Sequence, residues 1–284
     1  MPIHPDTAMG PVRLTVSDLA RSEDFYERAL GLQATERDDG TLGLGVGGQE
    51  PLVELRADRT APALDRRATG LYHLAILVPS RLDLALALGR IAEARWPLDG
   101  ASDHLVSEAL YLSDPDGNGI EIYRDRPRQE WRRRQGQLEM ATIPLDLDSV
   151  VGELAAADGA QPLAPPGTRI GHVHLQVADL DDAERFYNGV LGFDVMVRGY
   201  PGALFVAAGG YHHHLGLNTW QSAGASPPPP GSIGLRSFEI ELPSDAELER
   251  VLERVRAAGI PSERQNGATL VRDPSGNAVL LSAP

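Results

Sequence analysis

Two stretches of the chain are near copies of one another. Val16–Leu32 reads VSDLARSEDFYERALGL and Val177–Phe193 reads VADLDDAERFYNGVLGF; both begin V-x-D-L, contain a Phe-Tyr pair and end with a Leu-Gly step. A second matching pair closes each half of the chain, SDPDGNGIEIY at Ser113–Tyr123 and RDPSGNAVLLS at Arg272–Ser282. Because self-similarity at a fixed separation marks duplicated structural units, the sequence predicts two related halves.

The halves are expected at residues 1–125 and 167–284, joined by a linker over 126–166. The linker is polar and contains prolines, and one amphipathic helix is expected around Leu145–Ala156. Where the first half ends, Arg124–Arg134 reads RDRPRQEWRRR and is strongly basic. We interpret this basic stretch as a solvated linker segment.

Each half divides again into two units. Four short alternating apolar runs, GPVRLTV, GLYHLAILVP, GHVHLQV and LRSFEIELP, have the period of β-strands. A helix is expected after each run, and the candidate capping residues are Ser17, Ser80, Asp179 and Ser244. Two or three short strands follow each helix, so βαβββ modules are expected at 8–60, 68–125, 168–221 and 233–284. The proline-rich stretch Ser222–Ser232 is predicted to be a loop, since prolines are excluded from helix interiors and central strands.

The predicted fold class is therefore α+β. A single βαβββ module has an open sheet with an exposed apolar face, and pairing two modules buries that face and encloses a cavity. Four modules predict two such pairs, forming two open-barrel sheets.

Composition excludes several classes of function. The net charge of −14 repels nucleic-acid backbones, so no nucleic-acid partner is expected. No apolar run approaches eighteen residues, so no membrane span is expected. The absence of a basic and apolar leader and of cysteine favours a cytoplasmic protein. Without cysteine, a metal ion would be bound through imidazole, carboxylate, carbonyl or water.

Histidine and glutamate occupy equivalent positions of the modules. Aligned on the end of each first strand, the residues five positions earlier are Pro11, His73, His172 and Ser237; the matching last-strand positions hold Glu54, Glu121, Gly216 and Leu280. Glu121 interrupts the apolar strand GIEIY, where a buried carboxylate without a partner would be costly. Alone, Glu121 would more simply face solvent or pair with an arginine. Together with His73 and His172 it gives the two-histidine, one-carboxylate set of non-haem Fe(II) oxygenases.

The stretch DHLVSEALYLSDPDGNGIE closely resembles the signature of the type I extradiol ring-cleavage dioxygenases. The matching positions are His104, the pair Leu110–Tyr111, the turn Asp114–Gly117 and Glu121. Ser102 departs from the signature, which prefers Gly, Asn or Thr there. Over nearly its whole length the chain resembles the vicinal oxygen chelate superfamily, which also includes glyoxalase I and the fosfomycin-resistance proteins. Within it, the overall pattern resembles that of the two-domain catechol 2,3-dioxygenases, including the segment YHHHLGLN.

The resemblance implies metal ligands at His73, Glu121 and His172. The implied cofactor is Fe(II), with Mn(II) left open because it accepts the same ligands. The implied substrates are a small aromatic diol, a catechol or substituted catechol, and O2. The implied product is of the 2-hydroxymuconic-semialdehyde type. A homo-oligomer remains open at this stage.

The resemblance also implies catalytic residues around the metal. His213, in the segment YHHHLGLN, matches the family's acid-base histidine; His104 matches a histidine of the second coordination sphere, and Tyr111 matches a tyrosine that binds the substrate oxygen. Further residues are expected to contact the substrate or support the ligands: His174, His212, His214 and Asn218. Trp220, Phe205 and Tyr211 are near the histidine segment in sequence, and core packing is the favoured role for Phe205.

In the family's well-known members all these residues lie in the C-terminal half, but here they are divided between modules two and three. We therefore hypothesise that module two pairs with module three, and module one with module four. The active cavity would then span both halves, and the second cavity would be structural. The rival arrangement pairs modules one and two and would use Glu54, His73 and Glu121, a glyoxalase-like set that lacks one ligand.

Two other functions remain as alternatives. The same fold serves metal-dependent isomerases and lyases of the glyoxalase type. It also serves metal-free proteins that bind small molecules such as drugs. The latter would have no need of His73, His172 and Glu121 at the ligand positions.

Overall fold

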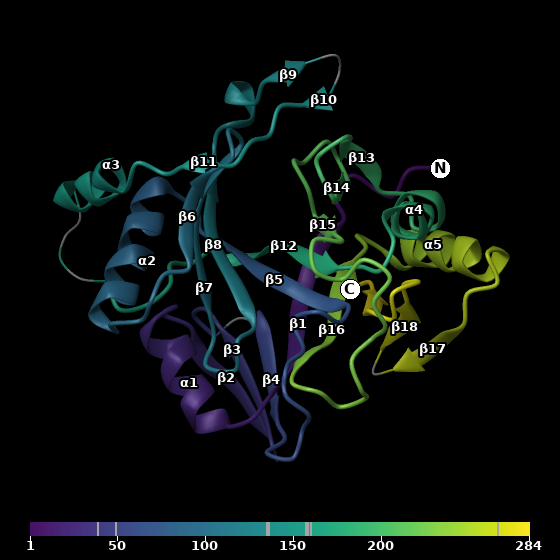
Figure 1. The fold of residues 1–284 in the computed structure, drawn as a ribbon, viewed down its shortest axis with the longest axis horizontal. Helices are drawn as coiled ribbons and strands as arrows, with labels where there is room; N and C mark the ends of the chain where they lie inside the picture. Colours follow the sequence, from purple (N-terminus) through teal and green to yellow (C-terminus); the bar gives the residue numbers. More distant parts are fainter. Residues whose placement is uncertain (39, 49, 135–136, 157–158, 160, 266) are drawn as a thin grey trace.

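The computed structural model describes residues 1–284 except 39, 49, 135, 136, 157, 158, 160 and 266 (Figure 1). Module one comprises β1 (Ala8–Val16), α1 (Leu19–Arg28), β2 (Gln33–Asp38), β3 (Thr41–Gly45) and β4 (Val53–Ala57). Module two comprises β5 (Gly70–Leu77), α2 (Arg81–Glu93), β6 (Gly100–Asp103), β7 (Ser107–Ser113) and β8 (Gly119–Asp125). Module three comprises β12 (Arg169–Gln176), α4 (Leu180–Glu184) with the π-helical turn η3 (Arg185–Val190), β13 (Asp194–Val197), β14 (Ala203–Ala207) and β15 (Leu215–Asn218). Module four comprises β16 (Gly234–Glu241), α5 (Asp245–Ala257), β17 (Ser262–Gln265), β18 (Ala268–Arg272) and β19 (Ala278–Ser282).

The strands form two large sheets, and each combines one module from either half of the chain. The eight-stranded sheet has the order β17-β18-β19-β16-β1-β4-β3-β2, and the main part of the nine-stranded sheet has the order β6-β7-β8-β5-β12-β15-β14-β13. In each module the first strand pairs in parallel with the last. The other edge of each first strand is therefore free to pair with a strand of another module. There β1 pairs with β16, and β5 pairs with β12, both antiparallel. The predicted pairing of module two with three and of one with four is confirmed.

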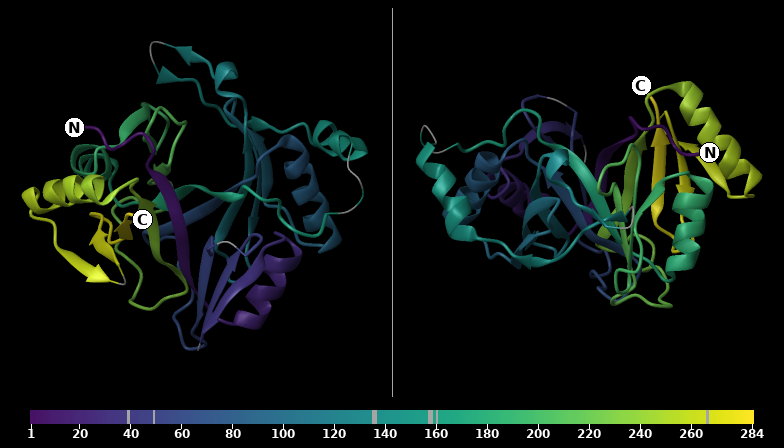
Figure 2. Two further views of the ribbon diagram at one scale, coloured as in Figure 1. Left: turned by 180° about the vertical axis from the view of Figure 1, so that it is seen from behind. Right: turned by 90° about the horizontal axis from the view of Figure 1, so that it is seen from above.

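The helices cover the outer faces of the two sheets. Figures 1 and 2 show α1 and α2 on one side of the molecule and α4 and α5 on the other, with the strands between them. Alternate residues of a strand, such as Val12, Leu14 and Val16 of β1, pack against the helices in one large apolar core. The residues between them face the inside of the curled sheets. In the described part of the chain no helix is both long and apolar enough to span a membrane.

The two repeated sequence motifs contact each other. The tyrosine of the Phe-Tyr pair donates a hydrogen bond to the first aspartate of the Asp-Pro-x-Gly-Asn turn: Tyr26 to Asp114 at 3.3 Å, and Tyr187 to Asp273 at 3.0 Å. Each aspartate also accepts backbone N–H groups of its own turn. In each contact the helix and the turn come from modules whose strands lie in different sheets. The two buried hydrogen bonds therefore link the two sheets at two places.

Three of the four expected helix caps are confirmed. The side chains of Ser80, Asp179 and Ser244 each accept a backbone N–H three residues on. The prediction for Ser17 is wrong, because α1 begins at Leu19 and Asp18 is its cap. Ser17 instead donates its hydroxyl to Asp116 in the turn of module two.

The linker contains η1 (Arg128–Glu130), β9 (Arg133–Arg134), β10 (Gln137–Leu138), β11 (Ile143–Pro144), α3 (Leu147–Gly152) and η2 (Glu153–Ala156). The helix expected around residues 145–156 is thus present as α3 and η2. β11 adds to the edge of the nine-stranded sheet beside β6, so the linker extends that sheet. Residues 222–232 form no helix or strand, as predicted.

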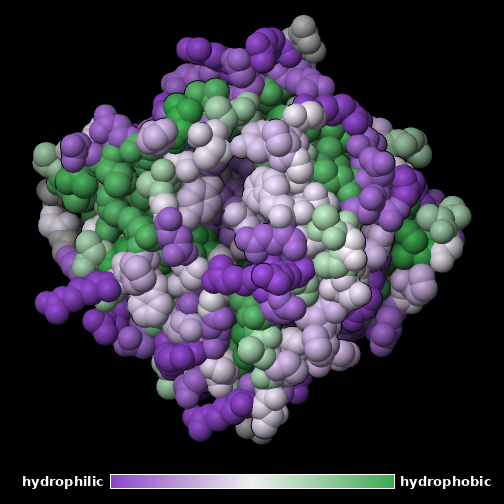
Figure 3. All heavy atoms as spheres, viewed as in Figure 1, coloured by the Kyte–Doolittle hydropathy of each residue, from purple (hydrophilic) through white to green (hydrophobic). Residues whose placement is uncertain are grey.

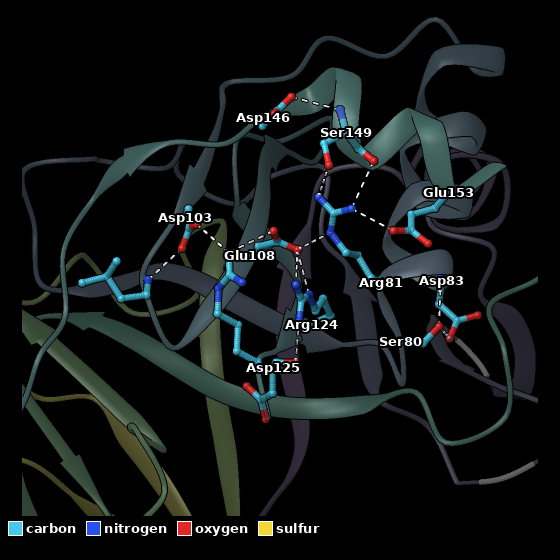
Figure 4. A network of polar contacts seen from close by, with 12 residues as sticks. Ser80, Arg81, Asp83, Asp103, Glu108, Arg124, Asp125, Asp146, Ser149 and Glu153 are labelled. Carbon is cyan, nitrogen blue, oxygen red and sulfur yellow. Dashed lines mark hydrogen bonds and ion pairs between the residues drawn. The ribbon is translucent and has the colours of Figure 1, made fainter. Parts of the chain in front are cut away.

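The interpretation of the basic stretch as solvated is wrong for its first residues. Arg124 lies in β8 and binds the buried Glu108 at 2.6 Å, and Arg126 binds both Glu108 and Asp103. Arg81 of α2 reaches the same carboxylate at 2.9 Å (Figure 4). A buried carboxylate needs such partners, so these arginines brace the outer face of the sheet.

Candidate metal centre

Three side chains from three adjacent strands converge inside the nine-stranded sheet. Glu121 Oε2 lies 2.9 Å from His73 Nε2 and 3.1 Å from His172 Nε2. The two Nε2 atoms are 3.3 Å apart. Within the described residues this is the one group of His, Asp and Glu whose potential ligand atoms all lie within 4.8 Å of one another, and all three residues are buried. The predicted ligand set is therefore brought together.

The strand register explains this convergence. Ala75 of β5 is paired with Glu121 on one side and with His172 on the other, so its small side chain leaves room between them. A bulge at Gly171 turns His172 inward, although Ile170 faces the outer core. A Cβ atom at Gly171 would lie 1.9 Å from the Tyr123 hydroxyl, so only glycine fits at the bulge.

The electrostatics of the group favour a cation. Burial by itself would raise the pKa of Glu121, but contacts first with His172 and then with His73 hold that pKa well below its usual range. Burial lowers the pKa of His172 to about 4, although Glu121 opposes this shift. At neutral pH a carboxylate thus lies beside a neutral imidazole with a lone pair to share. Among the described residues the ion-pair partners of Glu121 are the two histidines and no arginine or lysine. A buried negative charge next to nitrogen donors fits a divalent metal ion.

A cavity of about 450 Å³ opens beside the group. His73 and Glu121 line its floor together with residues of β6 and β7, of β14 and of the linker. Figure 3 shows the surface hollowed on this face, between the strands of module two and those of module three. Aromatic side chains surround the space: Tyr72, Tyr111, Tyr200, Phe205 and Trp220. This size and lining are typical of a small-molecule site.

His104 and Tyr111 form a hydrogen-bonded pair on one wall of the cavity. The Tyr111 hydroxyl lies 2.7 Å from His104 Nε2, and His104 Nδ1 lies 2.8 Å from the carbonyl oxygen of Ala141. The carbonyl accepts only, so His104 carries its proton on Nδ1 and accepts from Tyr111. Burial, followed by the charge of Glu121, raises the pKa of Tyr111 well above its ordinary value, so its hydroxyl remains protonated.

The three histidines of YHHHLGLN precede β15 and point in different directions. His213 lines the cavity and packs against His172, with ring centroids 4.1 Å apart and ring planes tilted by 49°. Burial, then the neighbouring His172, lowers the pKa of His213 well below its usual range. His212 is fully buried and lies 2.8 Å from Asp125. His214 accepts the backbone N–H of Ala208, and burial lowers its pKa to about 3.

His174 and Asn218 occupy different surroundings. His174 lines the cavity beside His73, and its Nε2 has no hydrogen-bond partner among the described residues. Gly216 lies opposite on β15, where a Cβ would come within 2.8 Å of the His174 ring. The glycine at this equivalent position therefore makes room for an imidazole. Asn218 is buried at the end of β15 and accepts the backbone N–H of Trp220; like His212 and His214, it is not among the residues that line the cavity.

Two of the earlier expectations are corrected. Glu54 does not join His73 and Glu121, because β4 lies in the other sheet and Glu54 pairs there with Arg13 and Arg236. The rival arrangement of modules one and two is therefore wrong. Phe205 was expected to serve core packing, but its side chain also lines the cavity.

Sequence reasoning missed several residues around the site. Met140 and Thr142 of the linker close the cavity, and Tyr72 and Tyr200 line it. No pattern in a linker indicates which cavity it will cover. Tyr72 had a usable signal, because it directly precedes His73 on a first strand.

Comparison with known proteins agrees with this geometry. A family model described as the Glyoxalase/Bleomycin resistance protein/Dioxygenase superfamily matches residues 8–122 and 169–281. Over 282 residues, 98% of either chain, the sequence is 45% identical to a protein of Bacillus subtilis (strain 168) named catechol-2,3-dioxygenase. The chain therefore belongs to the glyoxalase, bleomycin resistance and dioxygenase superfamily.

Solved structures show the same fold at low sequence identity. A putative dioxygenase from Bacillus subtilis superimposes with a TM-score of 0.66 and 14% identity, covering 100% of this chain and 86% of that one. Glyoxalase I from Zea mays superimposes with a TM-score of 0.58 and 19% identity, covering 97% of this chain and 92% of that one. The predicted α+β fold of four βαβββ modules is thus confirmed.

Proposed function

We propose that the chain is an extradiol ring-cleaving dioxygenase, which opens a catechol or substituted catechol with O2 at a metal ion held by His73, Glu121 and His172. The observation that carries the proposal is the convergence of these three side chains, with Nε2 and Oε2 atoms 2.9–3.3 Å apart, beside an aromatic-lined cavity. The 45% identity to a protein named catechol-2,3-dioxygenase over 98% of the chain supports the reaction class.

We propose Fe(II) as the metal. His73, His172 and Glu121 would hold this ion, and the bound metal would supply redox chemistry and coordination sites for the diol and O2. Mn(II) accepts the same donors, and reconstitution with each metal separates the two. The domain limits 1–125 and 167–284 stay part of the proposal, with the cavity spanning both.

The residues of this chain prepare the diol for reaction. The Tyr111 hydroxyl, now donated to His104, is placed to donate instead to a substrate oxygen on the same wall. His104 can accept a diol proton or return one, with its Nδ1–H fixed on the Ala141 carbonyl. His213 lines the same cavity, and we propose that it takes up and returns the second proton.

The proposed reaction balances without a further reductant. The ring bond next to the diol breaks, and both atoms of O2 remain in the product, an unsaturated hydroxy acid that also carries an aldehyde. Phe205 and Trp220 offer apolar faces to hold the ring while this happens. His174 lies beside the same wall, and we propose that it contacts the substrate.

Oxygen uptake tests the proposal. Protein reconstituted anaerobically with Fe(II) should consume one O2 per catechol and form a yellow product. The Glu121→Gln protein, treated identically, should consume none. Uptake that never exceeds the rate of free Fe(II) would contradict the proposal, and isomerase or lyase activity with Ni(II) or Zn(II) would then favour the glyoxalase type. Absence of any bound metal would favour a small-molecule binding protein.

A further inference from the structure

A chain of hydrogen bonds leads from the protein surface to the cavity behind the candidate metal centre. Asp125, at the end of β8, has a side chain that is 26% exposed. Its Oδ1 lies 2.8 Å from Nε2 of His212, which is fully buried. Nδ1 of His212 lies 2.8 Å from Nδ1 of His213, and His213 lines the cavity. The three residues come from module two and from the loop before β15 of module three.

The order of donors along this chain is determined by its first member. A carboxylate only accepts hydrogen bonds, so Nε2 of His212 donates to Asp125. When His212 is neutral its single N–H is the one on Nε2, so its Nδ1 is bare and accepts. Nδ1 of His213 is then the donor in the contact between the two rings. The remaining nitrogen of His213, Nε2, keeps its lone pair on the edge of the ring away from His212.

The surroundings hold His212 in this orientation. Its ring lies between Tyr211, at a centroid distance of 4.0 Å, and Trp131 of the linker, at 5.4 Å. A rotated ring would turn carbon atoms toward both Asp125 and His213 and lose two hydrogen bonds in a fully buried place, which is unfavourable because each polar group left there lacks a partner. The Tyr211 hydroxyl donates to the same oxygen of Asp125 at 3.2 Å and helps to fix the carboxylate.

We infer that Asp125 and His212 are positioning residues, which set the tautomer of His213 so that its Nε2 presents a lone pair to the cavity. His213 is thereby prepared to accept a proton from a bound diol without first exchanging its own. The logic is that of a carboxylate that orients an imidazole for a neighbouring group, here extended by a second imidazole. For its kinetic part the inference rests on the proposed function, whereas the tautomer is a property of the protein alone.

Nuclear magnetic resonance tests the tautomer directly. Protein labelled with 15N-histidine and loaded with diamagnetic Zn(II) should show His213 with a protonated Nδ1 and a bare Nε2, assigned by the loss of these signals in His213→Ala. In Asp125→Asn the amide offers both a donor and an acceptor, so the second tautomer of His213 should appear. A protonated Nε2 on His213 in the unmodified protein, or an unchanged spectrum in Asp125→Asn, would overturn the inference.

Kinetics with catechol and the Fe(II)-loaded protein test the consequence. Asp125→Asn should lower kcat by about tenfold to a hundredfold, the usual effect of removing a residue that orients an active-site group, with KM for catechol changed by less than about twofold. Glu54→Gln is the control, because it neutralises a carboxylate of the other sheet that pairs with Arg13 and Arg236; its kcat should stay within about twofold. Equal losses in both variants would overturn the positioning role.

A pair of His212 variants adds a rescue test. In His212→Asn the amide oxygen takes the place of Nδ1 and can accept from His213, whereas His212→Leu cannot. The Asn variant should retain about tenfold more kcat than the Leu variant, and equal loss in the two would contradict the inference. If the unmodified protein consumes no O2 with any catechol, the proposed function fails, and the NMR result still decides the tautomer.

Discussion

The two sheets have the same architecture, yet the cavities inside them differ in chemistry. The nine-stranded sheet holds two imidazoles around Glu121 beside a cavity of about 450 Å³. The eight-stranded sheet encloses a cavity of about 550 Å³ at the equivalent place. There Glu54 takes the strand position of Glu121 but lies 3.4 Å from Arg13 and 3.3 Å from Arg236. Arg13 also binds Glu239 at 2.8 Å.

The difference teaches what makes one of two similar cavities a metal site. Glu54 already has two guanidinium partners and is partly exposed, so its charge is compensated by the protein itself. Glu121 is buried beside two imidazoles and the neutral Tyr111, and its ion pairs among the described residues are with His73 and His172, so its charge fits a cation from outside. The fold places a carboxylate at the same strand position in both sheets. Whether that carboxylate can bind a metal depends on the residues of the neighbouring strands.

The largest effect that this comparison predicts is on metal binding. Glu121→Gln should weaken Fe(II) or Mn(II) binding by at least about a hundredfold, because a charged ligand is replaced by a neutral amide. Glu54→Gln, at the equivalent position of the other sheet, should leave the metal content unchanged. Metal analysis after dialysis measures both. Loss of metal in Glu54→Gln would break the distinction between the cavities.

His172→Ala and His73→Ala sharpen the same point, since they lie in different halves of the chain. Each should abolish stoichiometric iron in a dialysed sample, because either change leaves only two ligands. Retained stoichiometric iron in His172→Ala would contradict a site shared by modules two and three.

Metal binding should also stabilise the fold. Saturation at a hundred times Kd adds about 2.7 kcal/mol to the free energy of unfolding, which raises Tm by roughly 4–5 °C in a chain of 284 residues. A melting curve with and without chelator measures the shift. The shift should vanish in Glu121→Gln and persist in Glu54→Gln, and an equal shift in both would assign the effect to metal bound elsewhere.

Alkaline pH should reveal the buried tyrosines. Burial, with nearby carboxylates or tyrosines, raises the pKa of five tyrosines well above 10: Tyr26, Tyr111, Tyr123, Tyr187 and Tyr211. Because the folded-state pKa is raised, their stabilising contribution is complete below pH 10 and is lost as pH rises through the folded-state pKa. Near-ultraviolet titration should show these five ionising only together with unfolding, and five freely titrating groups in folded protein would contradict the burial.

The smallest predicted effect concerns the matched contacts between the sheets. Tyr187→Phe and Tyr26→Phe each remove one hydroxyl from a buried aspartate, at 3.0 Å and 3.3 Å respectively. Each should cost about 1–2 kcal/mol of unfolding free energy in urea, with the larger loss for the shorter bond. Neither variant should change the metal content. A loss of metal in Tyr26→Phe would mean that the turn of module two also shapes the site.

Much of this organisation was predictable because each motif occurs in both halves of the chain, so that each copy supports the interpretation of the other. The V-x-D-L and Asp-Pro-x-Gly-Asn motifs placed the modules, and the equivalent strand positions singled out His73, His172 and Glu121 before any contact was known. A buried Glu121 was favoured only together with His73 and His172, because alone it would more simply face solvent or pair with an arginine. By contrast, Ser17 was expected to cap a helix that begins two residues later, because two adjacent polar residues offer the same signal.

The sequence by itself determined the modules, their order and the kinds of side chain available to a metal, because strand periodicity and repeated motifs are local properties. Only the tertiary structure decided that Arg13 and Arg236 would neutralise Glu54, that Arg124 and Arg126 would bind Glu108, and that Asp125 would reach His212. These contacts join strands from different modules or cross from one strand of a sheet to the next, and their register follows from bulges and sheet curvature that no short stretch of sequence records.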